Sequence, residues 1–144
     1  MDFEFNIIIN RPVKDVFDFF WTLDEQDFSK NKLIPVYKRV TEGPRRIGSV
    51  IREVVKTQYF TMEIFSEITD YTPDRSLGYR FHGAGMLGTL RYVFEPIGEG
   101  TKLIQQVKIN FKGFRKILNP LLPFTYGRKA DWRLRAVKDI LETA

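Results

Sequence analysis

The sequence predicts one α+β domain in which a seven-stranded, curved antiparallel sheet wraps around a long C-terminal helix. Three observations support this fold class. A strand-like segment opens the chain and leads into a helical apolar stripe, a run of strand-like segments covers residues 34–111, and an amphipathic segment covers about residues 125–142. A chain of 144 residues is an ordinary size for a single domain over 1–144. It buries roughly two thirds of its unfolded surface.

The first elements are predicted to be a strand and then two short helices. Residues 2–10 alternate apolar with polar side chains, as a half-buried strand does. Asn10 is expected to cap the first helix, whose first turn accommodates Pro12 and which ends near Leu23. A second short helix is expected over residues 25–30, with Asp24 as its cap. The apolar stripe of the first helix comprises Val13, Val16, Phe17 and Phe20.

Six further strands are expected, separated by turns that contain Gly or Pro. We place them near residues 34–42, 48–57, 59–70, 76–82, 87–96 and 101–111. The last two alternate most clearly between apolar and polar side chains. One wet and one covered face is typical of an antiparallel sheet. Their inward residues are expected to be Leu90, Tyr92, Phe94, Leu103, Gln105, Val107, Ile109 and Phe111.

A long amphipathic helix is expected at the C-terminus. Pro120 and Pro123 exclude a continuous helix through the segment that precedes it. At a rise of ~1.5 Å per residue, this helix is long enough to cover one face of the sheet. A twisted sheet that curls around one helix leaves space beside it. The apolar stripe of this helix comprises Tyr126, Ala130, Leu134, Val137 and Leu141.

The order of these elements resembles a known superfamily, and three short motifs add to the resemblance. They are Ile9-Asn10-Arg11-Pro12-Val13-Lys14-Asp15-Val16-Phe17, Ile68-Thr69-Asp70-Tyr71-Thr72-Pro73 and Gly100-Thr101-Lys102-Leu103. Over essentially its whole length, the chain resembles the START-related polyketide cyclase/dehydrase and lipid-transport superfamily, whose helix-grip fold is also that of the birch pollen allergen. The resemblance implies a cavity between sheet and helix that binds lipids, sterols or polyketides. It implies no catalytic residue.

We therefore expect the inward residues of the sheet and helices to line a ligand-binding cavity. The polar members matter most, because ligand pockets combine apolar walls with a few placed polar groups. Gln105 interrupts the apolar row of the last strand, and Arg52 or Glu53 is a further polar candidate. Alternatively, these groups bond to backbone or lie at the rim. The expected lining residues are Phe17, Phe20, Ile64, Ser66, Tyr79, Phe81, Leu90, Tyr92, Phe94, Gln105, Val107, Ile109, Tyr126, Ala130, Leu134 and Val137.

The sequence supplies little for the common catalytic or metal centres. It has no Cys, and His82 is its one His, so neither a zinc cluster nor a catalytic triad is expected. His82 should face solvent. The stretch from Gly83 to Gly88 matches a dinucleotide fingerprint, but a strand rather than a helix follows it. We expect a flexible hairpin there, a movable lip by hypothesis, and no cofactor.

Charge is distributed unevenly along the chain. Residues 1–100 carry 13 basic and 15 acidic side chains, residues 101–144 carry 10 and 3, and the net charge is +5. The preferred interpretation is a solvated helix face, and nucleic acid is a disfavoured partner. The apolar segment 118–124 is expected to pack in the core. Its alternatives are a portal or a transient contact with an anionic membrane. Trp132, expected opposite the apolar stripe, would mark a partner surface.

Three functions remain open at this point. The leading one is binding or transport of a small hydrophobic ligand. The second is a polyketide cyclase/dehydratase-type enzyme in which Tyr92 or Glu53 acts as acid or base. The third is a nucleic-acid or acidic-partner binder. The lack of a nucleophile motif favours a non-enzymatic role. Since no signal peptide follows Met1, we expect a cytoplasmic protein, either a monomer or a homodimer.

Overall fold

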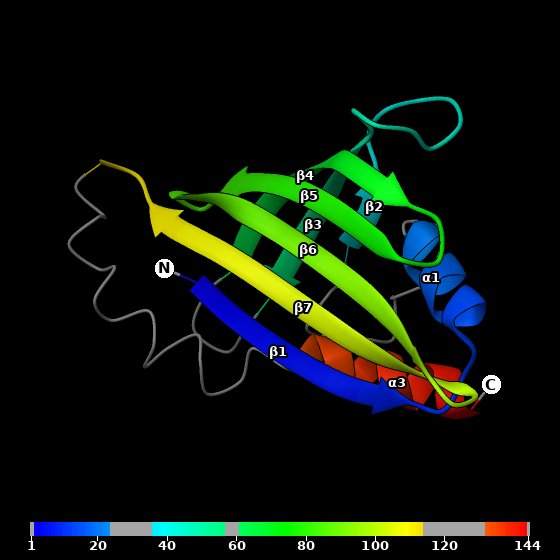
Figure 1. The fold of residues 1–144 in the computed structure, drawn as a ribbon. Coiled ribbons are helices and arrows are strands. Elements are labelled where there is room, and N and C mark those ends of the chain that lie inside the picture. Colours follow the sequence, from blue (N-terminus) through cyan, green and yellow to red (C-terminus); the bar gives the residue numbers. More distant parts are fainter. Residues whose placement is uncertain (1, 24–35, 57–60, 114–131, 144) are drawn as a thin grey trace.

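The computed structural model describes residues 2–23, 36–56, 61–113 and 132–143. In these ranges one strand, one helix, six strands and a final helix follow one another (Figure 1). The α+β class is therefore confirmed. The strands are β1 (Asp2–Ile9), β2 (Val36–Arg39), β3 (Val50–Lys56), β4 (Thr61–Thr72), β5 (Ser76–Gly83), β6 (Met86–Ile97) and β7 (Gly100–Phe111). The helices are α1 (Val13–Trp21) and α3 (Trp132–Thr143).

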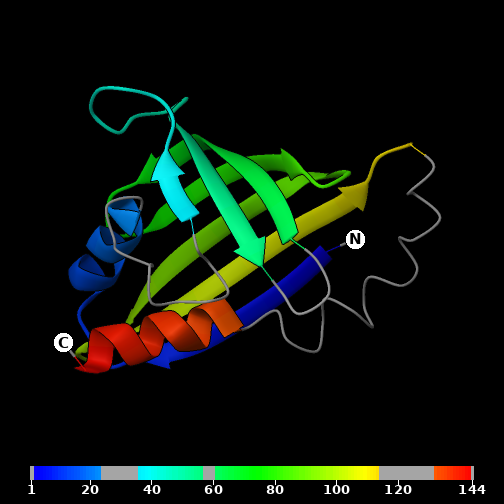
Figure 2. The ribbon, with the colours of Figure 1, turned by 180° about the vertical axis from the view of Figure 1, so that it is seen from behind.

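All seven strands form one antiparallel sheet in the order β1-β7-β6-β5-β4-β3-β2. From β2 to β7, each strand pairs with the next along the chain. Strand β1 pairs with β7 over its whole length, from Asp2 opposite Lys108 to Ile9 opposite Thr101. The sheet curves around the side on which α3 lies, which is the far side in Figure 1 and the near side in Figure 2. We call this side the inner face.

The alternation predicted for β6 and β7 is confirmed. Tyr92 is 1% exposed and Leu103 is fully buried, whereas Thr89 and Lys108 point to solvent. The outer face carries ion pairs between neighbouring strands, such as Arg80 Nη2 to Glu67 Oε2 at 2.8 Å. Because these pairs are exposed, each contributes little to stability. The inner face is where most of the large apolar side chains gather.

The glycine-rich stretch after β5 forms a tight hairpin. Gly83 and Gly85 have positive φ angles of 144° and 76°, and Ala84 between them has a φ of 52°. Glycine adopts such angles without strain, so the spacing of the glycines serves the turn. Strand β6 begins directly afterwards, which confirms the hairpin and excludes a dinucleotide fold at this place. His82, as expected, is exposed, and its ring lies 5.7 Å from that of Phe65.

The N-terminus of α1 differs from the prediction. Pro12 occupies the N-cap position with extended backbone angles, and no side chain caps the helix. The predicted cap, Asn10, is therefore wrong: it lies two residues before the cap, and its backbone N–H donates instead to Glu142 Oε1 at 2.8 Å. Helix α1 ends at Trp21, slightly before Leu23. The second short helix, over 25–30, lies outside the described residues.

Helix α3 lies along β1 on the inner face (Figure 2). Its stripe residues Leu134, Val137 and Leu141 are buried, as predicted. Its last turns are held by the Lys138 ammonium, which donates to the backbone oxygen of Ile8 at 2.6 Å. The beginning of the predicted helix, 125–131, and the segment 118–124 lie outside the described residues. No helix in the described ranges is long and apolar enough to cross a membrane.

An aromatic cluster fills the end of the inner face where α1 packs. The Phe20 ring lies 4.3 Å from that of Tyr92, and the Phe17 ring lies 5.5 Å from that of Phe94. Helix α3 joins this cluster through Leu134. A second, smaller cluster lies near the β5–β6 hairpin, at the other end of the sheet, and contains Phe81, Met86, Val107 and Ile109.

Candidate functional site

Polar side chains gather on the inner face, and three of them belong to the larger apolar cluster. They come from five strands and from α3, so the curvature of the sheet brings together residues far apart in the chain. Glu53 and Gln105 are 5% and 4% exposed, respectively, which is unusual burial for these residue types. We call the group the interior polar cluster. Its members are Tyr37, Glu53, Tyr79, Tyr92, Gln105 and Arg133.

Glu53 and Arg133 form an ion pair inside the fold. The Nη2 atom of Arg133 donates to Oε1 of Glu53, and the two side chains are 17% and 7% exposed, respectively. Burial by itself opposes the charge on Arg133, but the Glu53 carboxylate that it pairs with outweighs this effect, so the pKa of Arg133 is raised. The guanidinium therefore stays charged. The pair joins α3 to β3 and cancels two charges within the interior.

Tyr37 is the neighbour of this pair on the sheet. It lies directly opposite Glu53 in the β2–β3 ladder and is 7% exposed. Burial raises the pKa of Tyr37 well above its usual value, and the nearby Tyr79 and Glu53 add to this effect. The phenol is therefore neutral at physiological pH and acts as a hydrogen-bonding group rather than as an anion.

Gln105 has an unsatisfied oxygen. Gln105 lies directly opposite Tyr92 in the β6–β7 ladder, and its Nε2 donates to Tyr92 Oη at 3.3 Å. The Oε1 atom of Gln105 is buried and accepts no hydrogen bond from the part of the chain that the structure describes. A buried acceptor nearly always has a partner, so such an atom needs an explanation.

The residues predicted to line a cavity all lie on the inner side where they are described. Phe17, Phe20 and Phe94 pack on one another at the α1 end. Gln105 and Tyr92 are joined by a hydrogen bond. Tyr126 and Ala130 lie outside the described residues. Partly exposed members are Ile64, Ser66 and Leu90, and buried members are Phe17, Phe20, Tyr79, Phe81, Tyr92, Phe94, Gln105, Val107, Ile109, Leu134 and Val137.

Sequence reasoning missed two members of the interior polar cluster. Arg133 precedes Val137 by four residues and Leu141 by eight, so helical spacing places it on the inward stripe. That spacing was a usable signal. Tyr37 lies in the segment 34–42, for which a strand but no inward face was predicted, and the strand β2 in the described residues covers only Val36–Arg39. Of the two candidates Arg52 and Glu53, the structure turns Glu53 inward, while Arg52 bonds to Glu63 on the outer face at 2.7 Å.

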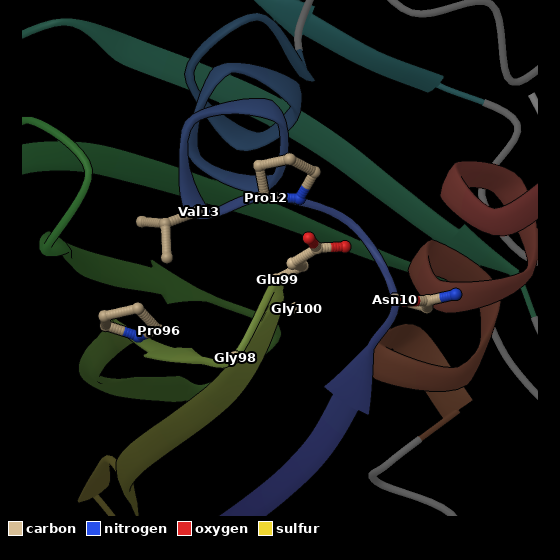
Figure 3. A pocket seen from close by; sticks show the side chains of 7 residues that line it. All are labelled: Asn10, Pro12, Val13, Pro96, Gly98, Glu99 and Gly100. Carbon is tan, nitrogen blue, oxygen red and sulfur yellow. The ribbon is translucent and has the colours of Figure 1, made fainter.

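A separate depression lies at the edge of the fold (Figure 3). It has a volume of about 500 Å³, is open to solvent, and lies between the start of α1 and the β6–β7 turn. Its walls are mostly backbone and small apolar side chains, and Glu99 is its charged member. None of its lining residues belongs to the interior polar cluster, and it offers few of the convergent polar groups that a ligand site uses. We do not assign it as the functional site.

Comparisons with known proteins agree with this fold. The model of the family described as polyketide cyclase / dehydrase and lipid transport matches residues 1–142. Ara h 8.0201 is 17% identical, with a TM-score of 0.79 and coverage of 100% of this chain and 99% of the other. A START superfamily protein from Mycobacterium smegmatis is 12% identical, with a TM-score of 0.80 and coverage of 99% and 97%. The Zhui aromatase/cyclase from Streptomyces sp. R1128 is 15% identical, with a TM-score of 0.78 and coverage of 99% and 93%. No curated protein matches in sequence. Identities this low show a shared fold.

Proposed function

Because the chain belongs to the polyketide cyclase / dehydrase and lipid transport family, we propose that it binds and carries a small hydrophobic molecule. The ligand is a lipid, a sterol or a polyketide-like compound. It lies between the inner face of the sheet and α3, with residues 1–144 acting as one domain. The lining is the set of inward residues described above.

One observation carries this proposal: inward-pointing residues in the middle of the sheet keep accessible surface. Ile64 and Leu90 point to the same side as the buried Glu53 and Val107, which lie opposite them in the ladders, yet both are only partly buried. Ser66, opposite Ile51, behaves in the same way. Apolar surface that stays accessible on a concave face is typical of a ligand site.

A pair of substitutions on β6 tests the proposal. Leu90→Trp places an indole ring on the inner face, whereas Thr89→Trp places the same ring on the outer face one residue away. With a neutral fluorescent dye such as Nile red as the probe, we expect wild type and Thr89→Trp to bind alike. Leu90→Trp should bind about tenfold more weakly, which corresponds to ~1.4 kcal/mol. Circular dichroism checks that both variants are folded.

Two results would contradict the proposal. One is that the wild-type protein binds no neutral apolar dye. The other is that a folded Leu90→Trp variant binds the dye as well as Thr89→Trp does, since binding would then lie outside the inner face. Native mass spectrometry of protein purified from its host complements the test, because a co-purified lipid or aromatic compound identifies the class of ligand.

A cyclase or dehydratase-type activity is the second candidate, and the interior polar cluster favours it. Tyr92 places a hydroxyl on the inner face, where it accepts a hydrogen bond from Gln105. Such a group can donate a proton while the walls orient a reactive polyketide. The test is to incubate the protein with a β-hydroxyketone and follow loss of one water by mass spectrometry. Loss of activity in Tyr92→Phe but not in Tyr71→Phe, an exposed tyrosine, supports the enzyme.

A further inference from the structure

We infer that the ligand is uncharged and carries a hydroxyl group, which donates a hydrogen bond to Oε1 of Gln105. This inference rests on the proposed function and makes it specific. It assigns a neutral alcohol or phenol, rather than a fatty acid or an amine, as the class of ligand.

The geometry of Gln105 supplies the acceptor. The side chain is 4% exposed and lies in a row with Phe5 of β1 on one side and Tyr92 of β6 on the other. Its amide nitrogen is oriented by Tyr92 Oη at 3.3 Å, which leaves Oε1 as an acceptor. Water would satisfy this oxygen on the surface, but in the interior the unpaired atom weakens the fold. A ligand hydroxyl removes that penalty on binding, and a methyl group of the same size does not.

The charges of the described residues around Gln105 disfavour an ionic ligand there. Glu53 and Arg133 compensate each other in a close pair, so neither is available to a ligand without leaving the other unpaired. Tyr37 next to them is neutral. Among the described residues, the further inner-face cation Arg39 lies opposite Ile51 on the edge strand β2, five strands from β7 in the sheet. A carboxylate or ammonium group placed at Gln105 would therefore meet no uncompensated opposite charge from the described residues of the neighbouring strands, which is unfavourable in a low-dielectric site.

The apolar body of the ligand has one direction in which to extend from Gln105. Towards α1, the inner face is filled by the rings of Phe20 and Phe94, which lie 5.8 Å apart. In the other direction, Val107 follows Gln105 on the same face of β7, and its ladder partner Leu90 keeps accessible surface. We therefore place the apolar body of the ligand on that side. The hydroxyl group is therefore the end of the ligand nearest α1, and the apolar body extends away from α1.

The test is a panel of four naphthalenes substituted at the same ring carbon: naphthol, methylnaphthalene, acetylnaphthalene and naphthoate. Calorimetric titration compares wild type, Gln105→Leu and Gln106→Leu, the last being an exposed glutamine on the same strand. We expect wild type and Gln106→Leu to bind naphthol about tenfold more tightly than methylnaphthalene. Gln105→Leu should lose that preference and bind methylnaphthalene as well as wild type does.

The outcomes separate this inference from the proposed function. If methylnaphthalene binds and naphthol has no advantage, or the advantage survives in Gln105→Leu, the inference is overturned and hydrophobic binding stands. Tighter binding of acetylnaphthalene or naphthoate than of naphthol overturns it too, since the site would then present a donor or a positive charge. If neither Nile red nor any of the four compounds binds, both fail. If Gln105→Leu does not fold, the preference of the wild-type protein for naphthol over methylnaphthalene alone decides whether the inference holds.

Discussion

Breaking the buried ion pair between α3 and β3 should destabilise the protein far more than breaking an exposed pair next to it. Arg133→Met removes the cation and leaves the Glu53 carboxylate inside the fold. The Glu53 side chain is 7% exposed, so water hardly replaces the lost partner. Arg52→Met is the matched control, because Arg52 neighbours Glu53 on β3 but pairs on the outer face with Glu63, at 41% and 49% exposure.

The expected magnitudes follow from these exposures. Removing one partner of a buried pair costs about 3–5 kcal/mol, because the remaining charge keeps its desolvation penalty and loses its compensation. We expect about 3 kcal/mol for Arg133→Met, at the lower end because its guanidinium is 17% exposed. The exposed pair should contribute no more than about 0.5–1 kcal/mol. Against a typical total of ~5–15 kcal/mol, the first loss is large.

Urea unfolding followed by circular dichroism measures the change in the free energy of unfolding for both variants. The dependence of that free energy on urea concentration is compared with wild type, to check that the same amount of surface is exposed on unfolding. The single variant Glu53→Leu and the double variant Glu53→Leu/Arg133→Met complete the cycle. The double variant should regain most of the stability, with a coupling of about 2 kcal/mol or more. A loss below ~1 kcal/mol for Arg133→Met, or no recovery in the double variant, would refute the assignment of a buried and compensated pair.

Two further predictions concern packing and pH. A Cβ on Gly88 would lie 2.7 Å from Cζ of Phe81 and closer still to a backbone carbonyl of β7, so Gly88→Ala should lower the free energy of unfolding by about 1–3 kcal/mol. Thr89→Ala, exposed on the same strand, should change it by no more than ~0.5 kcal/mol, and equal losses would contradict the packing argument. Because burial raises the pKa of Tyr37 in the folded state, its phenol stabilises the fold below the unfolded pKa of ~10 and loses that contribution as pH rises further. The free energy of unfolding, measured with urea, should therefore fall more steeply above pH ~10 for wild type than for Tyr37→Phe. Parallel pH profiles of the two proteins would show that Tyr37 titrates normally.

Much of the fold could be predicted because the signals are local. The alternation of Tyr92 and Phe94 against Thr89 assigns an inner and an outer face to β6, and the spacing of Leu134, Val137 and Leu141 assigns one to α3. The strand pattern after Gly83–Gly88, in place of the helix that a dinucleotide site needs, also distinguishes this hairpin from a nucleotide-binding loop. The prediction of Asn10 as the helix cap was wrong because Pro12 takes the N-cap position, so the helix begins later than a cap at Asn10 implies.

The candidate site could be predicted only in part. Inward placement of Glu53, Tyr92 and Gln105 was within reach of pattern reasoning, and all three do point inward. The partners of these side chains could not be predicted from the sequence pattern, because the Glu53–Arg133 pair joins residues 80 positions apart in the chain. No sequence period connects a strand to a helix across that separation.

The sequence by itself determined which side chains each strand and helix turns inward, since a period of two or of 3.6 is a property of a single segment. Only the tertiary structure decided which inward groups meet. Sheet curvature and the placement of α3 bring Arg133 to Glu53, and strand register sets Gln105 beside Tyr92 with one oxygen left over. Such long-range pairings depend on the packing of the whole chain, so they are determined only in the complete tertiary structure.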